Sequence, residues 1–173
     1  LTNVPQEVGD CVGHGAAHAA TYVFARQCVQ TGRVNEFHEV HASYCYGIAR
    51  VQIGKGQISG DGAAGAWAAE GLRQYGFIFL IDGVPPYSGQ LSRRWGSRPG
   101  VPANFIDFGK QFLIKTVARA RNANDVRDGL CNGYPSTVAS NVGFKMNPPV
   151  VDGRLINSPS GNWNHQMCVI AYD

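Results

Sequence analysis

The sequence predicts an α+β protein in which helices occupy the first half of the chain and strands the second. Two observations carry this prediction. Apolar residues recur at helical spacing up to about residue 75, whereas short apolar runs typical of strands follow after about residue 105. The stretch between residues 82 and 104 is rich in Pro, Gly and Ser, which indicates a crossing loop. We therefore expect a helical lobe over residues 1 to about 90, packed against an antiparallel β lobe over about 105–173.

Three helices are expected in the first half. The first covers residues 11–31 and ends at Gly32, because a glycine after the last turn commonly stops a helix. Small and apolar residues surround it on nearly every side, which indicates a central, buried helix. The other two helices cover residues 36–51 and 63–75, where apolar side chains recur every three or four positions.

Three strands and one short helix are expected in the second half. The strands cover residues 112–120, 136–142 and 167–172, and the last of these alternates its side chains with a period of two. The helix covers residues 125–132. Helices followed by strands place a cleft between two lobes of one unit that spans residues 1–173.

Composition excludes several classes of protein. The chain is 44% hydrophobic and 16% charged, so it can bury a substantial core and is not expected to be disordered. A net charge of +3, with three arginines around Trp95, is too small a basic surface to predict nucleic-acid binding. No apolar run is long enough to span a membrane, and no signal peptide is apparent at the N-terminus.

The five cysteines form an odd set, so at least one thiol is expected to be free. Cys28, Cys45, Cys131 and Cys168 lie in apolar stretches and are interpreted as small, buried core residues. Cys11 differs, because it opens the first helix within a glycine-rich segment. A helix N-terminus stabilises a thiolate, which is the nucleophilic form of cysteine.

His165 is the second residue with catalytic chemistry. It follows Asn164 and leads into the last expected strand, so its ring would be held rigidly, as a general base requires. By itself such a histidine is more often a cleft-edge or core residue with one hydrogen bond. The combination with Cys11, 154 residues earlier, favours a nucleophile–base pair.

The sequence resembles the papain-like cysteine peptidases, and more closely their divergent bacterial and phage branches. Four segments carry this resemblance in the family's order. They are Gly9–Gly15 at the helix start, Gly60-Asp61-Gly62 with the helix ending Gln74-Tyr75-Gly76, Pro86-Tyr87-Ser88-Gly89, and Asn164-His165 with Val169–Tyr172. The separation of Cys11 from His165 is slightly longer than the roughly 130–150 residues of papain-type enzymes.

The resemblance implies hydrolysis of peptide or protein substrates through an acyl-enzyme, without a cofactor or metal. Cys11 and His165 would form a thiolate–imidazolium pair, and Gln6 would help to bind the oxyanion together with the Cys11 backbone N–H. Substrate would lie along Gly60, Asp61 and Gly62 and near Asn164, with the backbone of Gly62 pairing in β fashion.

The sequence departs from the family at several places, including Val12 for the usual aromatic residue and Val8 for a disulfide-forming cysteine. Gln6 is five rather than six positions before the nucleophile, and Asp10 replaces the usual serine. A carboxylate there would disfavour a neighbouring thiolate, unless Asp10 serves as the N-cap of the helix. The family's imidazole-orienting asparagine lies well beyond the histidine, whereas this sequence stops at Asp173. Either the chain is a fragment or the third catalytic group is missing, and Asn162 and Asn164 are not favoured on spacing.

Two alternatives remain open. A zinc site could use Cys11, His14 and His18 on one helical stripe, with His38 and His41 as further imidazoles. A papain-like pseudoenzyme would keep the fold but act as a binding or structural module, for example in a phage particle. The replaced serine, the displaced glutamine and the missing asparagine favour this second alternative. Rapid, selective alkylation of Cys11 would separate the peptidase from the pseudoenzyme.

Overall fold

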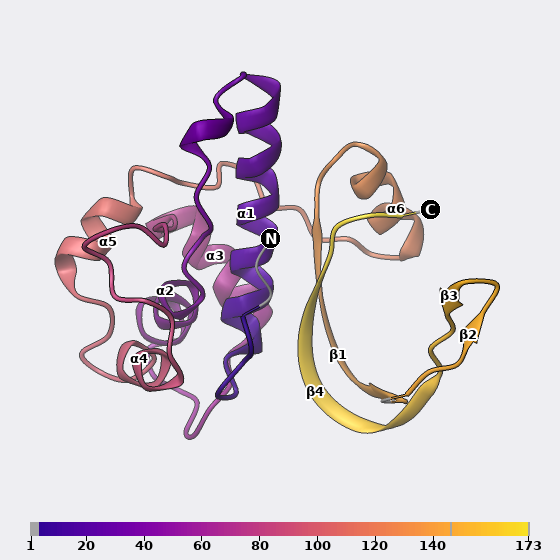
Figure 1. The fold of residues 1–173 in the computed structure, drawn as a ribbon. Coiled ribbons are helices and arrows are strands. Elements are labelled where there is room, and N and C mark those ends of the chain that lie inside the picture. The colour runs from indigo at the N-terminus through magenta and orange to yellow at the C-terminus, as the bar shows by residue number, and fades with distance from the viewer. Residues whose placement is uncertain (1–3, 146, 173) are drawn as a thin grey trace.

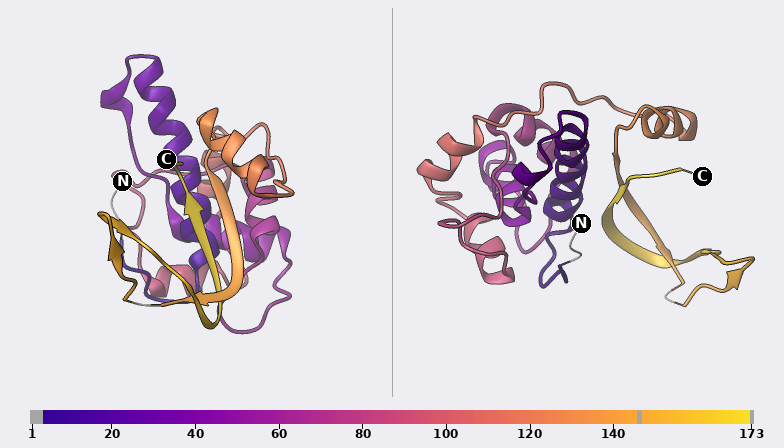
Figure 2. Two further views of the ribbon diagram at one scale, coloured as in Figure 1. Left: turned by 90° about the vertical axis from the view of Figure 1, so that its right-hand side faces the viewer. Right: turned by 45° about the horizontal axis from the view of Figure 1, so that its top comes forward.

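The protein is an α+β fold, seen here in a computed structural model that describes residues 4–145 and 147–172. Residues 4–112 form a helical half that includes the long helix α1, and the other helices of this half lie on one side of α1 (Figure 1). Residues 123–172, here called the β half, lie on its other side, and an extended connector, residues 113–122, joins the two (Figure 2). The helices are α1 Cys11–Gln30, α2 Ala42–Gly47, α3 Gly65–Tyr75, α4 Gly89–Trp95, α5 Ala103–Gly109 and α6 Ala123–Cys131, with a 3-10 turn at Val34–Glu36 and a π-helical segment at Ile48–Ile53. The strands are β1 Ser136–Phe144, β2 Val150–Val151, β3 Arg154–Leu155 and β4 Pro159–Val169.

The central helix α1 packs closely against α2 because its sequence supplies glycine at the contact. A Cβ atom at Gly13 would lie 2.6 Å from the Ala42 carbonyl oxygen and 2.7 Å from the Tyr46 Cβ, so no larger residue fits there. The helix ends at Gln30, and Gly32 follows in the left-handed region with φ of 69°. The expected bounds of this helix, and those of α3 and α6, are confirmed to within two residues.

The second helix starts later than residue 36, which corrects the sequence prediction. Residues 37–41 are extended, and the bridge Val40–Phe79 pairs them with a later segment. The backbone N–H of His41 donates to Ile78 O (2.9 Å), and that of Leu80 donates to Glu39 O (2.8 Å). These backbone groups are satisfied by long-range pairing, so a helix over the same residues would lose those bonds.

The Pro-, Gly- and Ser-rich stretch over residues 82–104 is not simply a loop. Its central part folds as α4, where the Ser88 Oγ caps the helix by accepting from the Leu91 backbone N–H (3.1 Å). Trp95 at the end of α4 is 1% exposed and packs between the rings of His41 and Phe105. The prolines and glycines therefore lie around the two ends of a short helix whose apolar face is buried.

The β half contains two small antiparallel sheets. β1 pairs with β4 from Ser136↔Val169 to Phe144↔Pro159, and irregularities in this register flank Val142. β2 and β3 form a short hairpin between them. The expected strand at 136–142 is confirmed, whereas the last strand starts earlier and ends at Val169 rather than at residue 172. The long, twisted β1–β4 ribbon lies alongside α1 (Figure 1).

The expected strand at residues 112–120 is wrong. These residues are all described, and none of them belongs to a strand. Phe112 packs against the rings of Phe77, Phe79 and Phe108, and the Ile114 N–H donates to Leu72 O (3.1 Å). The start of this apolar run is thus used to cover the helical core and not to extend the sheet.

The hydrophobic core lies entirely in the helical half. Among the described residues, every apolar side chain classed as buried falls between Cys11 and Val101. One cluster surrounds α1 and α3, and a second surrounds Tyr44, Ile48 and Trp95. No helix in the described part of the chain is long and apolar enough to cross a membrane.

All five cysteines are free thiols, as the odd number required of at least one. Cys28 and Cys45 are buried, in agreement with their interpretation as core residues. Burial raises the pKa of Cys45 to about 12 and that of Cys168 to about 11, so both remain protonated at neutral pH. The interpretation is wrong for Cys131, which is exposed at the end of α6.

Candidate active site

A cleft of about 560 Å³ lies between the first turn of α1, the start of α3 and the β1–β4 ribbon. It brings together six of the seven predicted site residues, namely Gln6, Cys11, Asp61, Gly62, Asn164 and His165. The seventh, Gly60, is exposed and is not among the residues that line it. The remaining lining residues are mostly small or carry carboxamides: Gly9, Val12, Ala63, Gly65, Ala139, Ser140, Asn141 and Gln166.

Cys11 is the first residue of α1 and is 8% exposed. The carbonyl oxygen of Asp10 accepts from the backbone N–H groups of Gly13 (2.8 Å) and His14 (3.2 Å), so the helix begins at the cysteine itself. The thiol therefore lies at the positive end of a 20-residue helix, in a position that stabilises an anion.

The segment that leads into Cys11 is held by the Pro86–Gly89 motif. The Gly89 backbone N–H donates to Glu7 Oε2 (2.7 Å), and the Tyr87 hydroxyl accepts from the Glu7 backbone N–H (3.2 Å). A Cβ at Gly89 would lie 2.8 Å from Val8 Cγ1, which explains why glycine occupies this position. The motif thus fixes the approach of the chain to the first helix.

Asp10 does not cap α1 through its side chain. Although it occupies the N-cap position, its carboxylate makes no capping hydrogen bond within the described chain. It is fully buried, accepts from the Ser92 hydroxyl (2.6 Å) and the Tyr87 hydroxyl (3.4 Å), and lies 3.6 Å from His14 Nε2. The charge beside Cys11 is therefore directed into the helical half, where three polar groups face it. Burial and the nearby acids raise the pKa of Tyr87 to about 12.

His165 lies within β4, directly opposite Ser140 of β1, and not ahead of the strand as expected. Its ring is half-buried and packs against Trp163, with 5.2 Å between ring centroids. Among the described residues no hydrogen bond joins the His165 ring to Cys11 or to any other group.

Gln6 lines the cleft near Cys11, but its carboxamide is turned toward its own backbone. The Nε2 group donates to Val8 O (2.6 Å). A carboxamide carries two N–H donors, so one of them is still free to face a ligand. Asn164 is exposed along the cleft, whereas Asn162 is not among its lining residues.

Gly62 is less accessible to a substrate strand than the sequence implied. Its N–H donates to the Tyr46 hydroxyl (2.9 Å), and its carbonyl oxygen accepts from Arg50 Nη1 (2.5 Å). A substrate strand could therefore accept a hydrogen bond from the Gly62 N–H only if the Tyr46 hydroxyl moved away. Arg50 also donates to the carbonyls of Ile58 (2.9 Å) and Gly96 (2.7 Å), which makes it a brace for this wall of the cleft.

Asp61 joins the glycine-rich wall to the start of α1. Its Oδ2 accepts from the Gly9 backbone N–H (3.3 Å) and forms an ion pair with Arg93 (3.2 Å). The hydrogen bond from Arg93 holds the pKa of Asp61 below its usual range. A Cβ at Gly9 would lie 2.7 Å from Asp61 Cβ, so the two residues are in direct contact.

Sequence reasoning missed Arg50 and Gln166. Arg50 is the only charged residue of the segment Ile48–Ile53, and that isolation is the signal that could have found it, whereas Gln166 lies among the polar residues of β4 and has no such signal. Gln166 is 4% exposed, and its Nε2 lies 3.5 Å from Val12 O. Asn141, at the irregularity in β1 beside Ser140, was also missed, because a break in strand register has no clear signature in one sequence.

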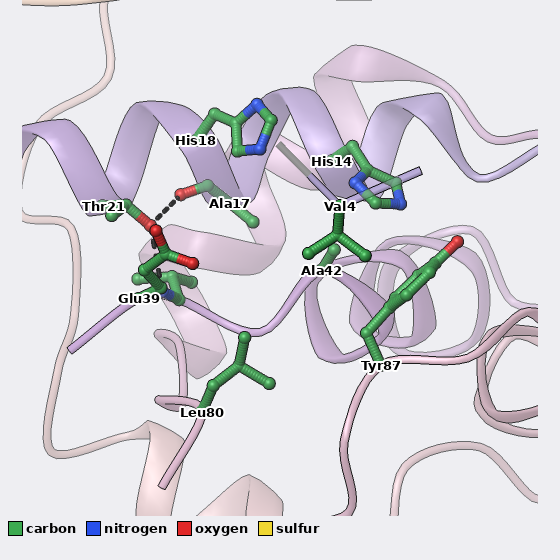
Figure 3. Close-up of a pocket in the computed structure, with 10 residues that line it drawn as sticks. Val4, His14, Ala17, His18, Thr21, Glu39, Ala42, Leu80 and Tyr87 are labelled. Carbon is green, nitrogen blue, oxygen red and sulfur yellow. Dashed lines mark hydrogen bonds between the residues drawn. The ribbon is translucent and has the colours of Figure 1, made fainter. Parts of the chain in front are cut away.

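The histidines of α1 line a different pocket from Cys11. His14 and His18 lie in a small pocket with Thr21, Glu39 and Tyr87 (Figure 3), and Cys11 is not among the residues that line it. Burial lowers the pKa of both imidazoles. The described residues contain no group of three or more His, Cys, Asp or Glu side chains arranged to hold a metal ion. Within this part of the chain, the zinc site considered from the sequence is therefore not formed.

Comparison of the chain with known protein families, with curated proteins and with solved structures finds no match.

Proposed function

We propose that this protein is a papain-like cysteine peptidase in which Cys11 is the nucleophile and His165 the general base. The observation that carries the proposal is the shared cleft: both side chains line it, although 154 residues separate them in the sequence. The placement of the thiol at a helix N-terminus adds the electrostatic feature that such a nucleophile requires. The division into a helical half and a β half is compatible with the papain-like architecture.

The proposed reaction is acyl transfer from a peptide bond to water. The Cys11 thiolate attacks the carbonyl carbon and forms a C–S bond, while the carbonyl electron pair moves to oxygen. As the C–N bond breaks, His165 gives its proton to the leaving amine. Water then attacks the thioester and passes a proton to His165, and cleavage of the C–S bond restores the thiolate and releases the carboxylic acid.

The oxyanion would be bound at the start of α1. The Cys11 backbone N–H belongs to the first turn, and the free N–H of the Gln6 carboxamide is the second candidate donor. Each such donor typically lowers the barrier by about 3 kcal/mol. The peptide itself would lie between the small residues Gly62 and Ala63 on one wall and Ser140 and Asn141 on the other.

A second candidate, a papain-like pseudoenzyme that binds a partner without cleaving it, is favoured by two contacts. Gln6 donates to Val8 O, and both backbone groups of Gly62 already have partners. These are hydrogen-bonding groups that the oxyanion and the substrate would need. In this second candidate the cleft holds a peptide, but the acylation step is absent.

Alkylation by iodoacetamide separates the two candidates, and Cys131 provides an internal reference. Cys131 is exposed, whereas Cys11 is 8% exposed, so accessibility alone favours Cys131. Because only the thiolate reacts, a peptidase should alkylate at Cys11 at least about tenfold faster than at Cys131 at pH 6. Mass spectrometry of tryptic peptides at several times gives both rates in one sample.

The His165→Ala variant should remove this advantage, and the His18→Ala variant should not, because His18 lines a different pocket, about two helical turns from Cys11. Hydrolysis of fluorescein-labelled casein, abolished by Cys11→Ser, would complete the assignment. Slow alkylation of Cys11 that is unchanged by His165→Ala, with no casein hydrolysis, would support the pseudoenzyme instead.

A further inference from the structure

The β half is tied to α1 by side chains at two places. At the far end of α1, Arg26 Nη1 donates to the carbonyls of Asn132 (2.8 Å) and Gly133 (3.0 Å), and its guanidinium lies over the Tyr134 ring. At the cleft end, Gln166 of β4 reaches into the helical half. The second tie is adjacent in sequence to His165, so it bears directly on the position of the imidazole.

The side chain of Gln166 occupies a slot that two glycines create. A Cβ at Gly15 of α1 would lie 3.1 Å from both the Cγ and the Nε2 of Gln166. A Cβ at Gly65, the first residue of α3, would overlap the Gln166 Oε1. Within 4 Å, the described atoms nearest to an added Cβ at either glycine all belong to Gln166. The side chain of Gln166 therefore fills the space that the two glycines leave.

Packing holds Gln166 more than hydrogen bonding does. The contact from Nε2 to Val12 O is 3.5 Å, which is long for a hydrogen bond. By contrast the residue is 4% exposed, although its neighbour Asn164 is exposed and His165 is only half-buried. Val12 directly follows Cys11 in α1, so the same side chain contacts the elements that carry both proposed catalytic groups.

We propose that Gln166 is a positioning residue that sets the separation between the Cys11 end of α1 and His165 on β4. That the two positioned groups are catalytic rests on the proposed function. The docking of β4 onto α1 and α3 through the slot at Gly15 and Gly65 does not depend on it. Loss of the Gln166 side chain lets the ribbon shift relative to the helix, and His165 moves with it.

A disulfide-trapping experiment tests the geometry without requiring any enzyme activity. In the His165→Cys variant, oxidised glutathione is used to form a disulfide between Cys11 and the introduced thiol, which is mapped by mass spectrometry. Adding Gln166→Ala should slow this trapping by about tenfold or more, since misplacement by about 1 Å strongly reduces the rates of oriented reactions. Adding Arg26→Ala, which cuts the distal tie, should slow it less. Equal or faster trapping in the Gln166→Ala background would overturn the proposal.

A double-mutant cycle between Gly65 and Gln166 supplies the matched control. Gly65→Ala should slow trapping because the new methyl group displaces the carboxamide, whereas Gly65→Ala added to Gln166→Ala should have little further effect. Gln166→Met, which fills the slot without donating, should stay close to the parent. If Gly65→Ala slows trapping equally in both backgrounds, the slot does not act through Gln166.

Alkylation of Cys11 then links the geometry to the proposed function. In an otherwise unaltered chain, Gln166→Ala should reduce the rate at pH 6 toward that of His165→Ala and leave the rate at pH 9 nearly unchanged, a pH profile that simple destabilisation does not give. A parent protein without rapid alkylation at pH 6 would contradict the proposed function alone, because the trapping experiment would still decide the role of Gln166.

Discussion

The two halves of the molecule differ in how far their apolar side chains are buried. The helical half contains all the buried apolar side chains of the described chain, including Trp95 at 1% exposure. The β half has Trp163 at 36% exposure, and its hairpin presents Val150 and Leu155 at 65% and 69%. The proposed nucleophile thus comes from the half with a buried apolar core and the proposed base from a thin, largely exposed ribbon. Alignment of the two depends on how the ribbon is docked, more than on how the core is packed.

Substitution of one tryptophan in each half should give the largest difference in the free energy of unfolding. Trp95→Ala removes a fully buried ring between His41 and Phe105 and should lower the free energy of unfolding by about 3–5 kcal/mol. Trp163→Ala removes a partly exposed ring and should cost about 1 kcal/mol. Urea unfolding followed by circular dichroism measures both. Similar losses for the two variants would show that the ribbon is as well packed as the core.

Acid should act on the helical half through His41. Burial lowers the pKa of His41 to about 4, although Pro85 O lies 2.8 Å from its Nε2. The folded state therefore binds this proton less readily than the unfolded chain. The contribution of the neutral His41 to the free energy of unfolding is complete above pH 6.5, and it falls by up to about 3 kcal/mol as the pH drops from 6.5 to 4.

The variant His41→Gln should remove most of this pH dependence, as urea midpoints at pH 7 and pH 4.5 would reveal. A smaller acid sensitivity should remain, because burial also lowers the pKa of His14 and His18. An unchanged loss of stability between the two pH values would place the acid-sensitive group elsewhere in the molecule.

The two walls of the cleft should also differ, because Arg50 braces only the wall that belongs to the helical half. Arg50→Lys keeps the charge but cannot reach the carbonyls of Ile58, Gly62 and Gly96 together. Loss of stability of about 2–3 kcal/mol is expected from the buried acceptors left without a donor. Hydrogen exchange should also accelerate at the Gly62 amide, and no such change is expected in β1. Uniform acceleration in both walls would contradict a local brace.

The smallest effects are expected on the hairpin. Val151→Thr and Leu155→Thr replace side chains that are 50% and 69% exposed, so the free energy of unfolding should change by no more than about 0.5 kcal/mol. Self-association, measured by light scattering, should decrease because the apolar surface is reduced. A large loss of stability would mean that these side chains pack against a neighbour in solution.

Local signals predicted much of this fold. The glycine stop after α1, the apolar spacing of α3 and the strand at 136–142 are all present in the structure. Two of the failures share one cause, which is contact between distant segments. Residues 37–41 leave the expected helix to pair near Phe79, and Phe112 leaves the expected strand to cover a cluster of rings. Propensity within a short window carries no record of such partners.

The candidate site shows the same limit at the level of single side chains. Cys11 and His165 were found from their residue types, their settings and the family resemblance, and one cleft contains both. The contacts of Gly62 with Tyr46 and Arg50 were not foreseen, because they depend on how the loop that carries Gly62 lies against the helical stretch that carries the other two. The role inferred for Gln166 depends in the same way on two glycines that are 50 residues apart in the sequence.

The exposed connector makes the molecule divisible. Residues 115–121 are exposed and belong to no helix or strand, so a protease could cut there without disturbing the core. Cys11 would then reside on one polypeptide and His165 on the other, held together through Arg26 and Gln166. Two separately produced fragments would form a complementation pair, in which, under the proposed function, alkylation of Cys11 at low pH would report reassembly.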